Sequence, residues 1–412
     1  MRFTPGLAMT SAHRLGQGGT LTPSTPTSIV PDGLLPQEIA KFEDLSGWTL
    51  GSSWTSTGTS VQKAASAGSD FVTRDISIPA GNVWVSYTLG GATAGFAGMQ
   101  LQGPFANYPF VNRVTANHVA RFSSPAHTRM RMLGSNAFDG AVENLQVVPM
   151  DDLLAQPSDI YIMAGQSLMA AEQKSLPVDP AKDYWVPRCL YWPGVQNNTY
   201  GARVDEVAAC TAPLQMVQAS QGVSPAVSFA QEVEKSTAAG RTVLIIACAN
   251  GGSRLVGPDA EWNPAGTGGT GAQLYDLMRD RTLAALAEKP GNAVKALVWA
   301  QGESDRSSTI DVDYPPVFSA MVSQLRSDLS APTLPVMLLG PMPDDTTSTQ
   351  PLFIATQEKL DEASGDATAV PGVHYVARES GYISSDGTHP EPEGNRRIGR
   401  AAAQRFVALN TL

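Results

Sequence analysis

Short apolar runs alternate with longer amphipathic stretches through the C-terminal two thirds of the chain. The apolar runs predict buried strands at Asp159–Met163, Thr242–Ala249, Val294–Ala300, Leu334–Leu339 and Gly372–Val376. Between the runs, apolar residues recur at three- and four-residue steps, which predicts helices, as in Phe318, Met321, Val322 and Leu325. A last helix is expected to begin near Pro392. Alternating strands and helices predict a parallel sheet covered on both faces, with functional residues at the carboxyl ends of its strands.

The pattern differs in the first part of the chain. Between about Ile39 and Met150, short segments alternate apolar with polar residues, as in Phe71–Ile78 and Val83–Leu89, with a Pro–Gly turn between these two. This alternating pattern predicts an antiparallel β-sandwich, or jelly roll, for residues 37–150. Residues 1–36 have no apolar period and predict an extended arm. The predicted organisation is therefore an arm (1–36), a β-module (37–150) and an α/β domain (151–412).

Composition and charge narrow the classes of function. The 412 residues carry a net charge of -10 with no basic cluster, which argues against a nucleic-acid partner or an anionic membrane surface. Neither an apolar run long enough to span a membrane nor a signal peptide is apparent. The five histidines include no pair at metal-ligand spacing, so neither a metal nor another cofactor is expected.

The three cysteines do not form a disulfide framework, because their number is odd. Cys248 lies inside an apolar run and is expected to pack as a small hydrophobic residue. Cys189 and Cys210 flank one irregular segment, and the sequence leaves open whether they are bridged or free.

Candidate chemistry begins with the turn Asp386-Gly387-Thr388-His389. A carboxylate three residues before an imidazole can orient that ring as a general base, although Asp386 is also suited to capping the helix that follows. A serine that such a base would activate lies in Gly165-Gln166-Ser167, directly after the first predicted strand. Ser167, His389 and Asp386 thus form a candidate nucleophile, base and orienting acid.

A tetrahedral oxyanion needs hydrogen-bond donors aimed at it. Candidates are the backbone amide of Ser167, an amide of the Gly251-Gly252 turn and the side-chain amide of Gln301, each of which follows a predicted strand. Glu303 and Asp305, further along the Gln301 loop, are expected to hold that loop through hydrogen bonds. A glycosidase pair of Glu303 with Asp386 is the competing interpretation, and it would leave Ser167 and His389 without a role.

These blocks carry a resemblance that covers about residues 157–410. Gly-Gln-Ser-x-Met, the Gly-Gly turn, Trp-x-Gln-Gly-Glu-Ser-Asp and Asp-Gly-x-His, in this order, resemble SGNH-type hydrolases of the sialate O-acetylesterase and plant-type carbohydrate acetylesterase branch. The resemblance implies a flavodoxin-like α/β/α fold and metal-free removal of O-acetyl groups from sugars. By position it implies Ser167, Asp386 and His389 as the triad, with Gly252 and Gln301 in the oxyanion hole. The branch usually has Asn after the serine, where this chain has Leu168.

The arm and the β-module resemble, more loosely, those of tailed-phage and gene-transfer-agent spike or fibre proteins. That resemblance implies a location on a virion or particle surface, contacts with other particle proteins through the arm, and a homo-oligomer such as a trimer. The alternative location is that of a secreted bacterial enzyme without a usual signal peptide. The expected substrate is an acetylated capsular polysaccharide or exopolysaccharide. A non-catalytic glycan-binding adhesin on the same scaffold is the rival function.

A long insert, about Glu172–Gly222, follows the serine loop and is rich in aromatic residues. Tyr184, Trp185 and Trp192 are candidates for stacking on sugar rings, or for anchoring the insert on the domain. Gln166 and Arg254 are further candidate substrate contacts, and a surface ion pair is the competing role for Arg254.

Overall fold

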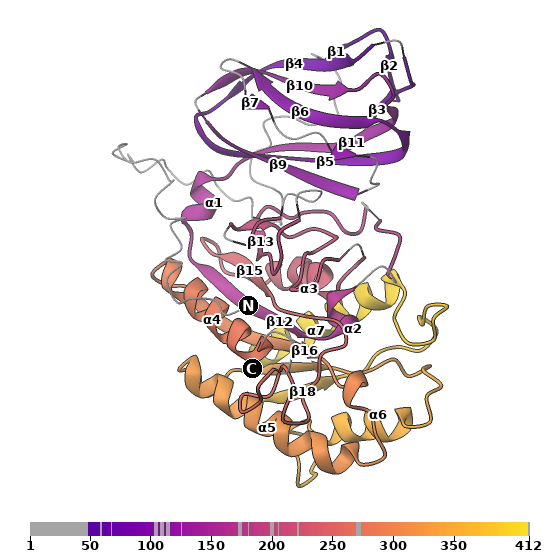
Figure 1. Cartoon of the computed structure of the whole chain (residues 1–412). Helices are drawn as coiled ribbons and strands as arrows, with labels where there is room; N and C mark the ends of the chain where they lie inside the picture. Colours follow the sequence, from indigo (N-terminus) through magenta and orange to yellow (C-terminus); the bar gives the residue numbers. More distant parts are fainter. Residues whose placement is uncertain are drawn as a thin grey trace.

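The computed structural model describes residues 48–410, apart from 58–59, 67, 103–105, 108–110, 113–115, 125, 172–174, 180, 198–201, 205, 221 and 269–272. The predicted arm, residues 1–36, lies outside the described residues. Two antiparallel sheets form one end of the molecule, and a sheet flanked by helices forms the other (Figure 1).

The antiparallel part contains two sheets that face one another. The first has the order β1-β4-β10-β6-β7, with β8 also on β6, and the second has the order β2-β3-β11-β5-β9. Their bounds are β1 Trp48–Leu50, β2 Trp54–Ser56, β3 Ser60–Lys63, β4 Asp70–Ile78, β5 Gly81–Ala94, β6 Phe96–Gln102, β7 Ala106–Asn107, β8 Val111–Asn112, β9 Ala116–Ser124, β10 His127–Gly134 and β11 Asp139–Pro149. Val72 and Met132 from the first sheet share a buried core with Tyr87 and Val147 from the second. The predicted antiparallel strands are confirmed, and jelly-roll connectivity stays a prediction.

The third sheet has seven strands in the order β14-β13-β15-β12-β16-β17-β18. Its strands are β12 Ser158–Gly165, β13 Cys189–Trp192, β14 Ala208–Ala209, β15 Thr242–Ala247, β16 Ala293–Ala300, β17 Val336–Leu339 and β18 Val373–Val376. All pairings are parallel except that of β14 with β13. The five strands predicted from apolar runs are present. Taken alone, those five follow the flavodoxin-like order 2-1-3-4-5.

Helices cover both faces of this sheet. Their bounds are α1 Asp151–Ala155, α2 Ser167–Ala170, α3 Pro225–Glu234, α4 Leu274–Glu288, α5 Ile310–Asp328, α6 Gln350–Lys359 and α7 Pro392–Asn410, with a 3-10 helix η3 at Glu303–Asp305. On one face, Phe229 of α3 and Phe406 of α7 both pack edge-on against Tyr161 of β12. The helices α4, α5 and α6 bury apolar residues in the core of the other face. No helix in the described residues is long and apolar enough to cross a membrane.

The antiparallel part and the α/β part share a core. Trp84 of β5 packs against Trp185 of the insert, with ring centroids 5.5 Å apart. Trp84 is also clustered with buried residues of β12 and β15. Beside it, Arg121 of β9 donates a hydrogen bond to the carbonyl oxygen of Val207 at 2.7 Å and pairs with Glu206 at 3.2 Å. The insert is therefore the surface on which the antiparallel part rests.

Candidate active site

The turn that follows β18 holds an imidazole against a carboxylate. His389 Nδ1 lies 2.8 Å from Asp386 Oδ2. The other carboxylate oxygen, Oδ1, accepts hydrogen bonds from the backbone N–H groups of Thr388 and His389, each at 3.0 Å, and from the Ser384 hydroxyl at 2.8 Å. Asp386 is therefore fixed at both oxygens, and one of them faces the ring.

The protonation state of Asp386 fixes the tautomer of His389. Partial burial of the carboxyl group favours its neutral form, but the hydrogen bonds from the His389 and Thr388 amides, the His389 ring and Ser384 outweigh burial and hold the Asp386 pKa well below its usual range. An ionised carboxylate can only accept, so in the neutral ring Nδ1 carries the proton and Nε2 has the lone pair. That is the form of histidine that a general base requires.

Ser167 begins the short helix α2 immediately after β12. The chain turns there at Gly165, whose φ is +127° and whose Cβ position, if filled, would lie 2.0 Å from the Ala300 carbonyl oxygen. The amides of Met169 and Ala170 both donate to Gln166 O at 2.9 Å. Within the described residues, the Ser167 N–H has no protein acceptor. Ser167 is 9% exposed, so most of the residue is covered by protein.

The Gln166 side chain forms hydrogen bonds within the protein. Its side chain is buried, and its Oε1 accepts hydrogen bonds from the backbone amides of Gly302 at 3.3 Å and Ser304 at 3.2 Å. The residue predicted as a substrate contact therefore ties the serine loop to the loop after β16. This use of its oxygen is not readable from the sequence, where Gln166 is simply a polar neighbour of the serine.

Gln301 lies at the end of β16 and is also buried. Its Nε2 donates to Ser253 O at 3.1 Å and to Asp305 Oδ2 at 2.6 Å, so both amide hydrogens have protein acceptors. Asp305 additionally accepts from the amides of Leu255 and Val256, which agrees with the structural role expected for it. An oxyanion role for Gln301 requires one hydrogen to leave its acceptor, and the role stays a prediction.

Gly252 follows β15 with a φ of +71°, a conformation that favours glycine, and nothing lies within 4 Å of its Cβ position. The neighbouring Gly251 amide donates to Gln218 Oε1 at 2.8 Å. For the Gly252 N–H, in contrast, the described part of the chain offers no acceptor. Of the two turn amides, Gly252 is thus the one available to an external oxygen.

Sheet topology brings these loops together. β12 lies between β15 and β16, so chain connections leave it in opposite directions, and ligands bind at such a switch point beyond the carboxyl ends of the strands. Ser167, Gly252 and Gln301 follow these three strands. The His389 turn joins them through Ser175, whose hydroxyl donates to Pro390 O at 2.9 Å, and through Glu303, which lies within electrostatic range of His389.

The structure corrects the predicted role of two aromatic residues. Trp185 is 1% exposed and donates its Nε1–H to Cys189 O, and Trp192 is 3% exposed and donates to Val204 O. Neither ring presents a free face to a sugar, so both anchor the insert, which is the alternative interpretation of these residues. Tyr184 is 47% exposed, and its role as a sugar contact stays a prediction.

The structure also shows the surroundings of Arg254, Leu168 and the three cysteines. Arg254 is exposed and lies 3.7 Å from Asp305, which is the ion pair considered as its competing role. Leu168, which replaces the usual Asn, is buried in the core beside α3 and α7. Cys189, Cys210 and Cys248 are all free and buried, so the pair is not bridged.

Glu303, for which the sequence predicts only a structural role, lies closer to the chemistry. Its Oε2 is buried without a hydrogen-bond partner. Burial raises the pKa of this carboxyl group, while Arg378, Arg306 and His389 oppose the rise. Asp386 is hydrogen bonded to His389 at 2.8 Å, and the glycosidase pair of Glu303 with Asp386, whose carboxyl groups would flank a sugar without bonding one another, stays the competing interpretation. No sequence pattern separates this buried carboxylate from the exposed ones around it.

Comparison with known proteins places the chain among carbohydrate esterases. A family model described as carbohydrate esterase, sialic acid-specific acetylesterase matches residues 157–408. A probable carbohydrate esterase of Arabidopsis thaliana is 29% identical over 192 residues, which is 44% of this chain and 68% of that protein. A probable 9-O-acetyl-N-acetylneuraminic acid deacetylase of Escherichia coli is 34% identical over 95 residues, 21% of this chain and 29% of that protein.

A solved structure of an Arabidopsis thaliana protein aligns with a TM-score of 0.49 and 22% identity, over 61% of this chain and 98% of the other. The family match covers more than half of the chain and includes the serine loop, the Gly252 turn, the Gln301 loop and the Asp386–His389 turn. The chain therefore belongs to the family of sialic acid-specific acetylesterases among the carbohydrate esterases.

Proposed function

We propose that the protein is a serine esterase that removes O-acetyl groups from a carbohydrate, with Ser167 as nucleophile, His389 as base and Asp386 as orienting acid. The observation that carries this proposal is the fixed Asp386–His389 pair, 2.8 Å apart, on the sheet edge where Ser167 also lies. The membership of the family and the names of the two relatives support the same reaction class.

The reaction follows from the positions of donors and acceptors. His389 Nε2 takes the hydroxyl proton as Ser167 Oγ forms a bond to the acetyl carbonyl carbon, and Asp386 stabilises the imidazolium that results. The negative charge that develops on the carbonyl oxygen is met by the N–H groups of Ser167 and Gly252. Collapse of the intermediate breaks the bond to the sugar oxygen, which receives the proton from His389. Water then attacks the acetyl-serine by the same route and releases acetate.

The setting of the substrate is part of the proposal. An O-acetylated capsular polysaccharide or exopolysaccharide, met by a protein carried on a virion or particle, fits the resemblance of the N-terminal sequence to spike and fibre proteins. Attachment would involve the arm at residues 1–36, outside the described residues, and a trimer is the expected assembly. A sialic acid ester is the alternative glycan that the name of the Escherichia coli relative suggests.

Turnover of p-nitrophenyl acetate and acetate release from O-acetylated polysaccharide test the proposal. Ser167→Ala should lower kcat on both by roughly 10⁴-fold or more, because no other group can form the acyl intermediate. Ser364→Ala makes the same change at an exposed serine after α6 and should retain turnover of both substrates.

Each result separates two functions. Ester cleavage without release from polysaccharide would retain the chemistry and reject the glycan. Equal background rates for wild type and Ser167→Ala on every ester would reject the esterase and leave the adhesin.

A further inference from the structure

The carbonyl group next to the proposed base is held by a side chain from the insert. The Ser175 hydroxyl, 1% exposed as a residue, donates to Pro390 O at 2.9 Å. On the other side of the same turn, Ser384 N donates to His389 O at 2.7 Å and Glu391 N donates to Tyr382 O at 2.7 Å. The backbone at His389 and Pro390 is thus fixed from two directions, once by its own hairpin and once by Ser175.

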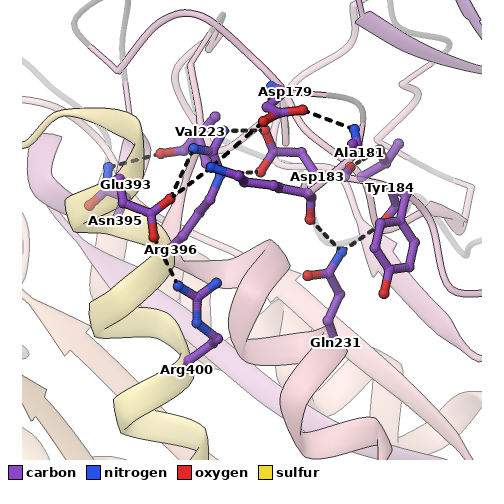
Figure 2. Close-up of polar contacts among 12 residues, drawn as sticks. Asp179, Ala181, Asp183, Tyr184, Val223, Gln231, Glu393, Asn395, Arg396 and Arg400 are labelled. Carbon is purple, nitrogen blue, oxygen red and sulfur yellow. Dashed lines mark hydrogen bonds and ion pairs between the residues drawn. The ribbon is translucent and has the colours of Figure 1, made fainter.

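Asn395, in the first turns of α7, holds Ser175 in place. It is 0% exposed, and its Nδ2 donates to Ser175 Oγ at 3.1 Å and to Val223 O at 2.8 Å. Its Oδ1 accepts from Arg378 Nη1 at 3.1 Å. Figure 2 shows the Asn395 side chain directed toward Val223, beside the pair of Arg396 and Asp183. A buried amide with each of its groups bonded is rigid, because any rotation would leave a polar atom unpaired.

The segment before α3 connects this network to α2, the helix that Ser167 begins. Val223 N donates to Ser175 O at 2.9 Å, and Gly222 N donates to Ala171 O at 3.1 Å. The Ser224 hydroxyl donates to Met169 O at 2.9 Å, within the helix that Ser167 begins. A short series of buried hydrogen bonds therefore leads from the helix of the nucleophile to the carbonyl next to the base.

From this network we propose that Ser175 and Asn395 are positioning residues that keep His389 in register with Ser167. The inference rests on the proposed function, because it assigns them to the same triad. Neither residue touches the reacting atoms. The bridge limits how far the turn at residues 384–389 can move relative to the insert, because the hydrogen bond from Ser175 to Pro390 O lies next to His389.

The test compares kcat and KM on p-nitrophenyl acetate for full-length Ser175→Ala, Asn395→Asp and Ser175→Thr. Loss of the hydroxyl or of the amide donors should lower kcat by roughly 10- to 100-fold, because displacement of a catalytic group by about 1 Å has effects of this size. KM should change less than about twofold, because ground-state binding is untouched. Ser175→Thr keeps the hydroxyl and should recover most of kcat, which a general loss of packing would not explain.

Arg188→Met is the matched structural control. Arg188 is buried and bonds Glu234 and the carbonyl oxygens of Glu234 and Thr237, but it precedes β13 and so lies at the opposite edge of the sheet. This variant should lower the melting temperature and leave kcat unchanged where it is folded. The positioning role would be overturned if Ser175→Ala and Asn395→Asp both had the same kcat as the wild type. It would also be overturned if Arg188→Met lost as much kcat as they did. Absence of Ser167-dependent turnover in wild type would overturn the proposed function itself.

Discussion

Asp386 illustrates how one residue can be fixed by its own neighbours. Three of its hydrogen bonds come from residues within three positions of it in the sequence, and this is why the Asp-x-x-His spacing is readable from the sequence alone. Gln166 and Gln301 are not readable in this way. Their partners lie on other loops, so the sequence shows an amide side chain but not which of its atoms is already bonded.

Asp386→Asn should lower kcat by about 10²- to 10⁴-fold, because an amide in this position favours the wrong histidine tautomer. It should also change the pH dependence of stability. The Asp386 pKa is depressed in the folded state, so its contribution is present above the unfolded value of about 3.9 and is lost as pH falls below it.

Thermal melts of wild type and Asp386→Asn across pH check the second effect. The gap in melting temperature should be constant above about pH 5 and should narrow below about pH 4. A gap of the same size from about pH 7 to about pH 3 would contradict the assignment of these hydrogen bonds to the ionised carboxylate.

Gly165 offers a test of close contact at the nucleophile. A methyl group there would lie 2.0 Å from the Ala300 carbonyl oxygen, and the φ of +127° is unfavourable for any other residue. Gly165→Ala should therefore lower the free energy of unfolding by about 3 kcal/mol or more, measured by urea denaturation. Gly365→Ala is the control, since its φ is also positive but nothing lies within 4 Å of its Cβ position. Equal losses in both variants would show that strain in φ, and not contact with β16, sets the cost.

Among the elements, the strands are the most predictable and the insert the least. Every strand predicted in the α/β part is present in the structure. These predictions succeed because a short, continuous apolar run is typical of a strand buried on both faces. β13, Cys189–Trp192, is not predicted because its short apolar run lies among prolines and polar residues. The sequence also does not show whether the aromatic rings in this segment face protein or solvent. The beginning of α7 has a polar sequence typical of an exposed helix, yet Asn395 and Arg396 are both buried.

The insert is fastened to α7 by an ion pair. Arg396 donates to Asp183 through Nε at 2.8 Å and through Nη2 at 2.7 Å, with side-chain exposures of 5% and 2% (Figure 2). Asp183→Asn should lower the free energy of unfolding by about 2–4 kcal/mol, because it removes the buried carboxylate bonded to Arg396 through two nitrogens and leaves only Glu393, 3.5 Å away and partly exposed, as a counter-charge.

A double variant checks whether the charge is the cause. Asp183→Leu combined with Arg396→Met removes both charges and should recover much of the loss seen in urea denaturation of Asp183→Asn. The exposed pair of Arg397 and Glu379 is the control, and Glu379→Gln should change stability by less than about 1 kcal/mol. If the double variant were no more stable than Asp183→Asn, the loss of stability would come from altered packing of the insert and not from the unpaired charge.

Over the whole molecule, Trp84 lies in the core that the two parts share, and we expect it to couple their unfolding. Its ring is 3% exposed and packs on Trp185, while Arg121 lies 5.9 Å from its centroid. Trp84→Ala should lower the free energy of unfolding by about 3–5 kcal/mol, as large-to-small changes in cores do. Calorimetry of wild type should give one transition, and Trp84→Ala should separate it into two. Two transitions in wild type would show that the shared core does not couple the parts.

The position of Trp185 has a consequence for how this chain can vary over evolution. Its ring is contributed by the insert, which also carries Ser175 and Asp183, but it is covered by a residue of the antiparallel part. If recombination replaced the antiparallel part with another domain, the Trp185 ring would become exposed to solvent. Only a replacement domain with an aromatic side chain at the same junction would cover the ring again. The two parts are therefore expected to be inherited as a pair, with changes at Trp84 and Trp185 accompanying one another among descendants.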